Sequence, residues 1–146
     1  MFRTFGRFSP MIALMLAAVV VLAACSGGGG DGSNAPVQVQ VNLTEMKIDS
    51  SVTAFKVGVP YHFVVKNAGT VNHEFMIMPP VAPGKMSMEE MDKMGLVGID
   101  GEELPPGATK TADYTFTKAY PAGQLEMACH LTGHYEGGMH LPVTVQ

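Results

Sequence analysis

The sequence is poor in basic residues and in cysteine, and it contains no internal repeat. Its 146 residues include nine Lys and Arg against 13 Asp and Glu, and two of the nine, Arg3 and Arg7, precede an apolar run. Without these two, seven basic residues remain (9 − 2) and the formal charge is −6 (7 − 13). A surface that binds nucleic acid needs clustered Lys and Arg to contact phosphates. The composition therefore disfavours a nucleic-acid partner.

The sequence also lacks an apolar run long enough to cross a membrane, since residues 11–22 fall short of the roughly 20 that a span requires. This short run, with basic residues before it and small residues after it, is typical of a secretory signal over residues 1–24. Its end, Leu22-Ala23-Ala24-Cys25, resembles a bacterial lipobox, which implies cleavage before Cys25 and lipid attachment to its thiol. An ordinary signal peptide cut nearby is the alternative.

The lipobox sets an expectation for where the protein works. We expect an exported protein that is lipid-anchored to a bacterial membrane and faces the periplasm or the cell exterior. Residues 25–36 then form the lipidated Cys25 and a Gly-rich tether without apolar periodicity, which is flexible.

Residues 37–146 carry the alternation of apolar and polar residues that is typical of β-strands. The clearest case is 37–43, where Val or Leu occupies every second position. Further strands are expected at 52–57, 61–66, 71–78, 108–116, 123–129 and 140–145. About seven strands and no long helix predict an all-β protein, an antiparallel β-sandwich built as one domain.

One segment, residues 86–94, breaks the β pattern. It predicts a short helix, with Ser87 as the N-cap, Glu90 three residues later and Gly95 after the last turn. Thioethers suit Cu(I), so the methionines of this insertion are a candidate second copper site. They suit an adaptable apolar surface for packing or partner docking equally well. These methionines are Met86, Met88, Met91 and Met94.

The second cysteine lies in the segment that carries the most chemistry. With Cys25 lipidated, Cys129 is alone in an oxidising compartment, where a lone thiol is paired, reactive or bound to a metal. Cys129, His134 and Met139 are spaced Cys-x4-His-x4-Met, and His73 upstream supplies a second imidazole. A thiolate, two imidazoles and a weak thioether form the ligand set of a blue-copper site. Zinc, the rival, usually takes Cys and His without a thioether.

This loop, followed by a final strand, resembles that of the cupredoxins, in particular the auracyanin- and rusticyanin-like members and small copper-tolerance cupredoxins. The resemblance extends over residues 37–146. It implies a Greek-key β-sandwich that holds one type 1 copper, blue or green, on His73, Cys129, His134 and Met139. It also implies a one-electron carrier at the outer face of a bacterial membrane. The alternative is a periplasmic copper-binding protein for copper tolerance or sequestration.

The resemblance also implies how partners bind. We expect a monomer whose redox partners dock on an apolar patch around the exposed edge of His134, to which Leu131, Tyr135 and Leu141 contribute. An enzyme is not expected, because Cys129 and His134 have no evident third orienting residue or oxyanion motif for nucleophilic catalysis.

Other polar residues adjoin this ligand set or compete with it. His62 competes with His73, but it lies between two aromatic residues in a strand. His130 and His140 are neighbours of ligands and are expected to point to the opposite side of their strands. Many cupredoxins carry Asn directly after the upstream His, where this sequence has Glu74. We hypothesise that a hydrogen bond between Glu74 and His130 replaces the tie that this Asn makes.

Overall fold

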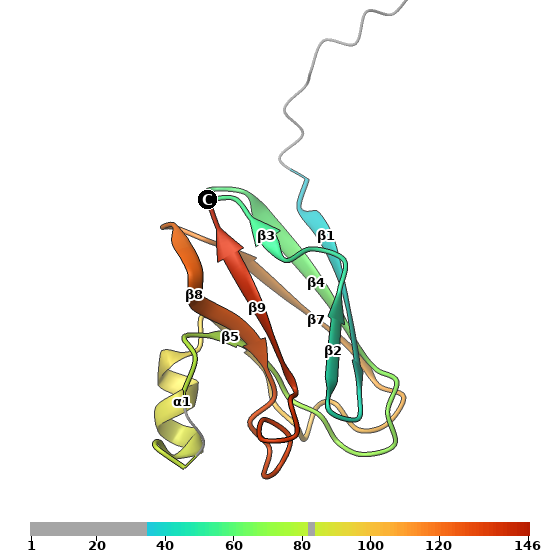
Figure 1. Ribbon diagram of the computed structural model, residues 1–146. Helices are drawn as coiled ribbons and strands as arrows, with labels where there is room; N and C mark the ends of the chain where they lie inside the picture. Colours follow the sequence, from blue (N-terminus) through green and yellow to red (C-terminus); the bar gives the residue numbers. More distant parts are fainter. Residues whose placement is uncertain (1–34, 82–83) are drawn as a thin grey trace, which may run out of the picture. The chain divides into compact units, whose positions relative to one another are not determined.

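A computed structural model describes residues 35–81 and 84–146, which form two facing β-sheets with one helix outside them (Figure 1). One sheet has the strand order β2-β1-β4-β7 and the other β3-β9-β8-β5-β6. The elements are β1 (Val37–Thr44), β2 (Lys47–Ser50), β3 (Ala54–Phe55), β4 (Pro60–Asn67), β5 (Phe75–Met78), α1 (Met88–Met94), β6 (Val97–Ile99), β7 (Thr109–Thr115), β8 (Tyr120–Ala128) and β9 (His140–Val145). The predicted sandwich and its short helix are confirmed.

The strands pair mostly in antiparallel fashion, as expected, but two pairs are parallel. These are β1 with β4 and β3 with β9. Parallel neighbours need a connection that crosses over, and here the chain leaves the first sheet after β2, adds β3 to the second sheet and then returns as β4. The sandwich is therefore antiparallel except at these two pairs.

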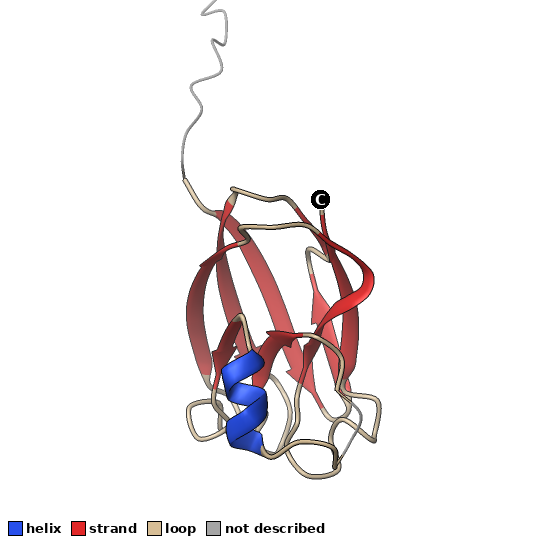
Figure 2. Cartoon of the chain, turned by 90° about the vertical axis from the view of Figure 1, so that its left-hand side faces the viewer, coloured by secondary structure: helices blue, strands red, loops and turns tan. Residues whose placement is uncertain are grey.

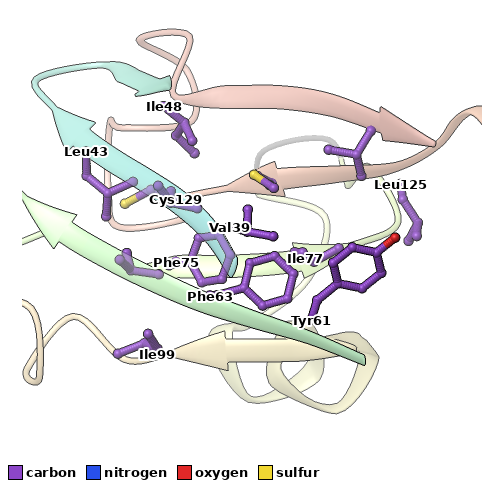
Figure 3. Packing of buried hydrophobic residues seen from close by; sticks show 14 of the residues in the cluster. Val39, Leu43, Ile48, Tyr61, Phe63, Phe75, Ile77, Ile99, Leu125 and Cys129 are labelled. Carbon is purple, nitrogen blue, oxygen red and sulfur yellow. The ribbon is translucent and has the colours of Figure 1, made fainter. Parts of the chain in front are cut away.

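The core lies between the sheets and follows the alternation seen in the sequence. In β1, Val39, Val41 and Leu43 are buried while Gln40 is exposed. Aromatic rings fill the middle of the core, where Phe63 packs 5.7 Å from Phe75, centroid to centroid. Figure 3 shows Cys129 among the apolar side chains of this core. The thiol is therefore held by the packed interior of the sandwich.

The loop before β5 differs most from the prediction. The expected strand 71–78 is reduced to Phe75–Met78, so His73 lies in the loop that precedes it. The fully buried Asn67 side chain holds this loop by donating to the carbonyls of Val71 and Leu104, each at 2.8 Å. These bonds satisfy backbone carbonyls that would otherwise need a neighbouring strand as a partner. The segment can therefore remain a loop. The short strands β2 and β6 were also not predicted.

The helix α1 packs against the outward side chains of β5, and Figure 2 shows the helix outside the strands of the sandwich. It begins after Ser87, whose hydroxyl accepts from the Glu90 N–H while the Glu90 carboxylate accepts from the Ser87 N–H. This is the predicted capping box, and the helix ends at Met94, before Gly95. Within 35–81 and 84–146, no helix is long and apolar enough to cross a membrane. The predicted signal peptide, Cys25 and all but the last two residues of the predicted tether lie outside the described residues.

Candidate metal centre

Three donor atoms converge at one end of the sandwich, where the β4–β5 and β8–β9 loops meet. They are His73 Nδ1, Cys129 Sγ and His134 Nδ1, and all lie within 4.8 Å of one another. His134 Nδ1 is 3.3 Å from both Cys129 Sγ and His73 Nδ1. Among the residues that the structure describes, no other group of His, Cys, Asp and Glu converges in this way.

Cys129 follows the last residue of β8 and is fully buried. Burial raises the pKa of its thiol, while backbone N–H groups of Glu74 and Leu131 act in the opposite direction. The Glu74 N–H donates to Sγ at 3.3 Å, and the Cys129 N–H donates to the Met139 carbonyl at 3.1 Å. Cys129 is thus tied to both loops, and its sulfur needs a cation to become a stable thiolate.

His73 is fully buried, and burial lowers its pKa, so the imidazole is neutral and suited to bind a metal. Its backbone N–H donates to the Leu104 carbonyl at 3.2 Å, and its Nε2 has no hydrogen-bond partner among the described residues. Gly69 lies against the ring, because a Cβ at that position would be 2.8 Å from Nε2. A side chain at position 69 would therefore press on the imidazole.

The β8–β9 loop folds tightly around His134 and Met139. The His134 N–H donates to Leu131 at 2.9 Å, and the Met139 N–H donates to the His134 carbonyl at 3.0 Å. Gly133 adopts φ 83°, a left-handed conformation that glycine accepts readily. Gly137 has a different reason to be glycine, since a Cβ there would be 2.6 Å from the Met46 sulfur. Met139 itself is fully buried beside Cys129.

Glu74 and His130 lie together, as hypothesised, but the hydrogen bond uses the backbone. The Glu74 carboxylate accepts from the His130 N–H at 3.3 Å, while its distance to the His130 ring Nδ1 is 3.7 Å. Both side chains are 5% exposed. The carboxylate thus links the two ligand loops next to His73 and Cys129, through a contact that does not depend on the His130 ring.

A stack of three rings borders the site, and the sequence did not predict it. Tyr135 stacks between His130 and His140, with centroid distances of 4.9 and 4.8 Å. The Tyr135 hydroxyl donates to the buried Glu126 at 2.6 Å, and His140 Nδ1 lies 3.4 Å from the other oxygen of that carboxylate. Burial and this hydrogen bond raise the pKa of Tyr135 to about 12. Glu126 therefore holds residues next to His134 and next to Met139.

The remaining predicted residues lie away from the three donors or only border them. His62 lies on the other sheet, where its Nδ1 is 2.7 Å from Asp113. His130 and His140 stack on Tyr135 and are not in the donor group. Leu131 and Leu141 are half-buried against the core. Met86, Met91 and Met94 pack with strand methionines, and the side chain of Met88 lies outside the described part of the chain.

The donor set fits copper. A buried thiol beside two imidazole nitrogens at these distances suits a cation that prefers nitrogen and sulfur ligands. Cu(I), Cu(II) and Zn²⁺ all satisfy this preference. Met139, the predicted fourth ligand, is buried in the same core and accepts a backbone hydrogen bond from Cys129, and zinc sites usually lack a thioether ligand. The residues present therefore favour copper over zinc.

Known proteins share this chain's sequence and fold, although no protein-family model matches it. It is 32% identical over 124 residues to the copper-resistant cuproprotein CopI of Rubrivivax gelatinosus, which covers 80% of this chain and 70% of the relative. It is 27% identical over 139 residues to the CopI of Pseudomonas aeruginosa PAO1, and this match covers 74% of this chain and 75% of the relative. Auracyanin A, a "blue" copper protein of Chloroflexus aurantiacus, superposes with a TM-score of 0.58 at 16% identity, covering 77% of this chain and 100% of that one.

The sandwich and its converging His, Cys and His donors define a cupredoxin-like copper protein. The likeness to auracyanin shows the shared fold. The 32% sequence identity to the Rubrivivax gelatinosus protein also shows that the chain belongs to the family of the CopI cuproproteins. The resemblance to cupredoxins that the Cys-x4-His-x4-Met loop indicated is confirmed.

Proposed function

We propose that this chain serves bacterial copper tolerance by binding one copper ion at a type 1 site formed by His73, Cys129, His134 and Met139. The convergence of His73, Cys129 and His134 within 4.8 Å is the observation that carries this proposal. The relationship to two CopI proteins, whose names describe copper resistance, directs it toward tolerance.

The residues of the site would each contribute something different. Bound copper supplies a one-electron couple between Cu(II) and Cu(I). The Cys129 thiol gives up its proton to become the strong thiolate donor, and its burial makes this release depend on the cation. His73 is already neutral, so it needs no deprotonation. Hydrogen bonds at both ends of the β8–β9 loop keep the donors in place, which limits ligand movement between the two oxidation states.

A second candidate function is that of a one-electron carrier, and the rigid ligand loops favour it. Glu74 and Cys129 connect the loops to each other, and Glu126 contacts Tyr135 in the β8–β9 loop and His140 at the start of β9. Such fixed donors lower the reorganisation that slows electron transfer. In this role a redox partner would dock near the half-buried His134.

We also propose export and a lipid anchor at Cys25, on the strength of the lipobox-like sequence before it. Residues 25–36 would then tether residues 37–146 to a bacterial membrane. Labelling with a fatty acid tests this, because the wild-type chain should incorporate the label and Cys25→Ala should not. Label on both forms, or on neither, would contradict the anchor.

The copper site is tested by adding one equivalent of Cu(II) and recording visible and EPR spectra. The wild-type chain should develop an intense thiolate-to-copper band that ascorbate bleaches reversibly, and Cys129→Ala should not. His62→Ala is the matched control, because this histidine pairs with Asp113 on the other sheet and its loss should leave the band unchanged. Absence of a band, with Cys129 still titrating as a free thiol, would overturn the proposal.

Growth of a deletion strain separates the two candidate functions. If the chain serves copper tolerance, the deletion should be copper-sensitive with normal respiration. Growth on copper should then be restored by the wild-type gene and by His62→Ala, but not by Cys129→Ala. Normal growth on copper with impaired respiration would instead favour the electron carrier.

A further inference from the structure

A second apolar cluster, separate from the main core, consists almost entirely of methionines. It lies between the outer face of β5 and the helix α1. Five of its six residues are methionines, and we call these five the methionine cluster. The six residues are Met76, Met78, Val81, Met86, Met91 and Met94.

The cluster forms because β5 is covered on both faces. Phe75 and Ile77 point into the main core, so Met76 and Met78 point outward, where α1 covers them. Met78 is fully buried, and Met76 and Met91 are 5% and 8% exposed. Met86 and Met94 are half-buried at the rim. The cluster therefore offers three thioethers in a dry interior and two that solvent reaches.

Packing alone does not call for methionine at these positions. In the part of the chain that the structure describes, the main core contains 19 buried residues, of which only Met127 and Met139 are methionines. The rest of that core is largely Val, Leu, Ile and Phe, which suit a strand, and Leu suits a helix face as well. In β5 itself the inward positions hold Phe and Ile, and only the outward positions hold Met. Thioethers are thus concentrated on one side of the sheet.

We propose that the methionine cluster is a Cu(I) site separate from the His73–Cys129–His134 site, an inference that rests on the proposed function in copper tolerance. Thioethers are soft, neutral ligands that select Cu(I) over Cu(II) and over harder metals. The single charge of Cu(I) costs less to bury than a double charge, and the half-exposed rim lowers that cost further. Met86 and Met94 would admit the ion from solvent, and Met76, Met78 and Met91 would complete its shell.

The cluster also adjoins the first site through the sheet. Met76 pairs with Ala128, the residue before Cys129, across β5 and β8. Its side chain points to the outer face, while Cys129 belongs to the main core. One copper site at the end of the sandwich and a second on the outer face of β5 would let a single small domain hold both a Cu(I) ion and a redox-active copper.

The test uses Cu(I) as the probe, delivered without oxygen in competition with a chromophoric Cu(I) chelator. The full chain with Cys129→Ala, which lacks the thiolate, should retain one tightly bound Cu(I). Adding Met78→Leu and Met91→Leu should weaken that binding by about tenfold or more. Leu has nearly the volume of Met, so packing is largely kept. Met127→Leu, a buried methionine of the main core, is the matched control and should leave the affinity unchanged.

Ag(I) in place of Cu(I) provides a second measurement that needs no cluster substitution. The methyl NMR signals of the cluster methionines should shift on addition of one equivalent, and that of Met127 should not. Absence of Cu(I) binding in Cys129→Ala would overturn the inference, and so would binding that survives the Leu substitutions. The Cu(II) band of the wild-type chain reports independently on the first site, so failure of the proposed function is distinguished from failure of the second site.

Discussion

Replacing Gly69 with alanine should disturb the copper site although Gly69 supplies no ligand. A Cβ at this position would lie 2.8 Å from His73 Nε2 and 2.7 Å from a Glu45 carboxylate oxygen. Ordinary contacts begin near 3.4 Å, so these neighbours must move apart by 0.6 Å (3.4 − 2.8) and 0.7 Å (3.4 − 2.7). The Glu45 side chain is exposed and can move aside, although this weakens its hydrogen bonds with Thr70. His73 is fully buried, so it has little room to move, and any displacement of its ring shifts a predicted copper ligand.

A shift of this size exceeds the tolerance of about 0.5 Å within which a binding site keeps its geometry. We expect Gly69→Ala to weaken copper binding and change the visible spectrum, and to lower the free energy of unfolding by about 1–3 kcal/mol, as overpacking does. Copper competition, absorption spectra and urea unfolding of the metal-free protein measure these effects. Gly98→Ala is the control, because its Cβ would meet nothing closer than 3.4 Å.

The combination of Gly69→Ala with Glu45→Ala separates the two contacts. It gives the new methyl group room on the Glu45 side and leaves the contact with His73 unchanged, so the spectrum should stay altered. A wild-type spectrum and copper affinity in Gly69→Ala would refute the reasoning. Restoration by the second substitution would show that Glu45, not His73, was the obstacle.

Three other perturbations test neighbouring contacts. Tyr135→Phe removes the hydrogen bond to the buried Glu126 and should lower the free energy of unfolding by about 1–3 kcal/mol, measured by urea unfolding. An unchanged free energy of unfolding would show that the bond adds no stability. Hydrogen bonds from Thr70 lower the pKa of Glu45 to about 2. The stabilisation from these bonds is therefore complete above the ordinary pKa of 4.5 and is lost as the pH falls toward 2. NMR titration of the Glu45 carboxylate checks this, and a pKa near 4.5 would contradict it. Glu74→Gln weakens the tie to the His130 N–H and should alter the redox potential or its pH dependence, and no change in either would remove that role.

Much of the fold was predictable because it depends on local patterns. The alternation in β1 and the capping box at Ser87 are readable within a few residues, and both appear as expected. The strand β5 was overextended toward its start, because the loop before it is held by Asn67 and not by a neighbouring strand. Strands of three or four residues, such as β6 and β2, carry too few positions for alternation to stand out.

The candidate site was predictable where its residues are close in the sequence, and not where the fold brings distant residues together. Cys129 and His134 share one loop, and their spacing alone places them together. Glu126 could not be found, because a glutamate in an alternating strand normally faces solvent, and only the fold brings Tyr135 over it. Glu45 and Thr70 are 25 residues apart, so their contact depends on how β1 and β4 pair. Contacts of this kind arise from topology and leave no local pattern.

The two-residue turn between β1 and β2 contacts both ligand loops. Glu45 accepts from the Thr70 hydroxyl in the β4–β5 loop, and the Met46 sulfur lies against Gly137 in the β8–β9 loop. Met46 adopts φ 58°, a left-handed conformation that costs a non-glycine residue about 1–2 kcal/mol. Grafting this metal centre onto another β-sandwich therefore requires a third piece besides the two ligand loops. A design that transplants residues 68–74 and 129–139 without 44–47 would carry every donor but lose the contacts that this turn makes with both loops.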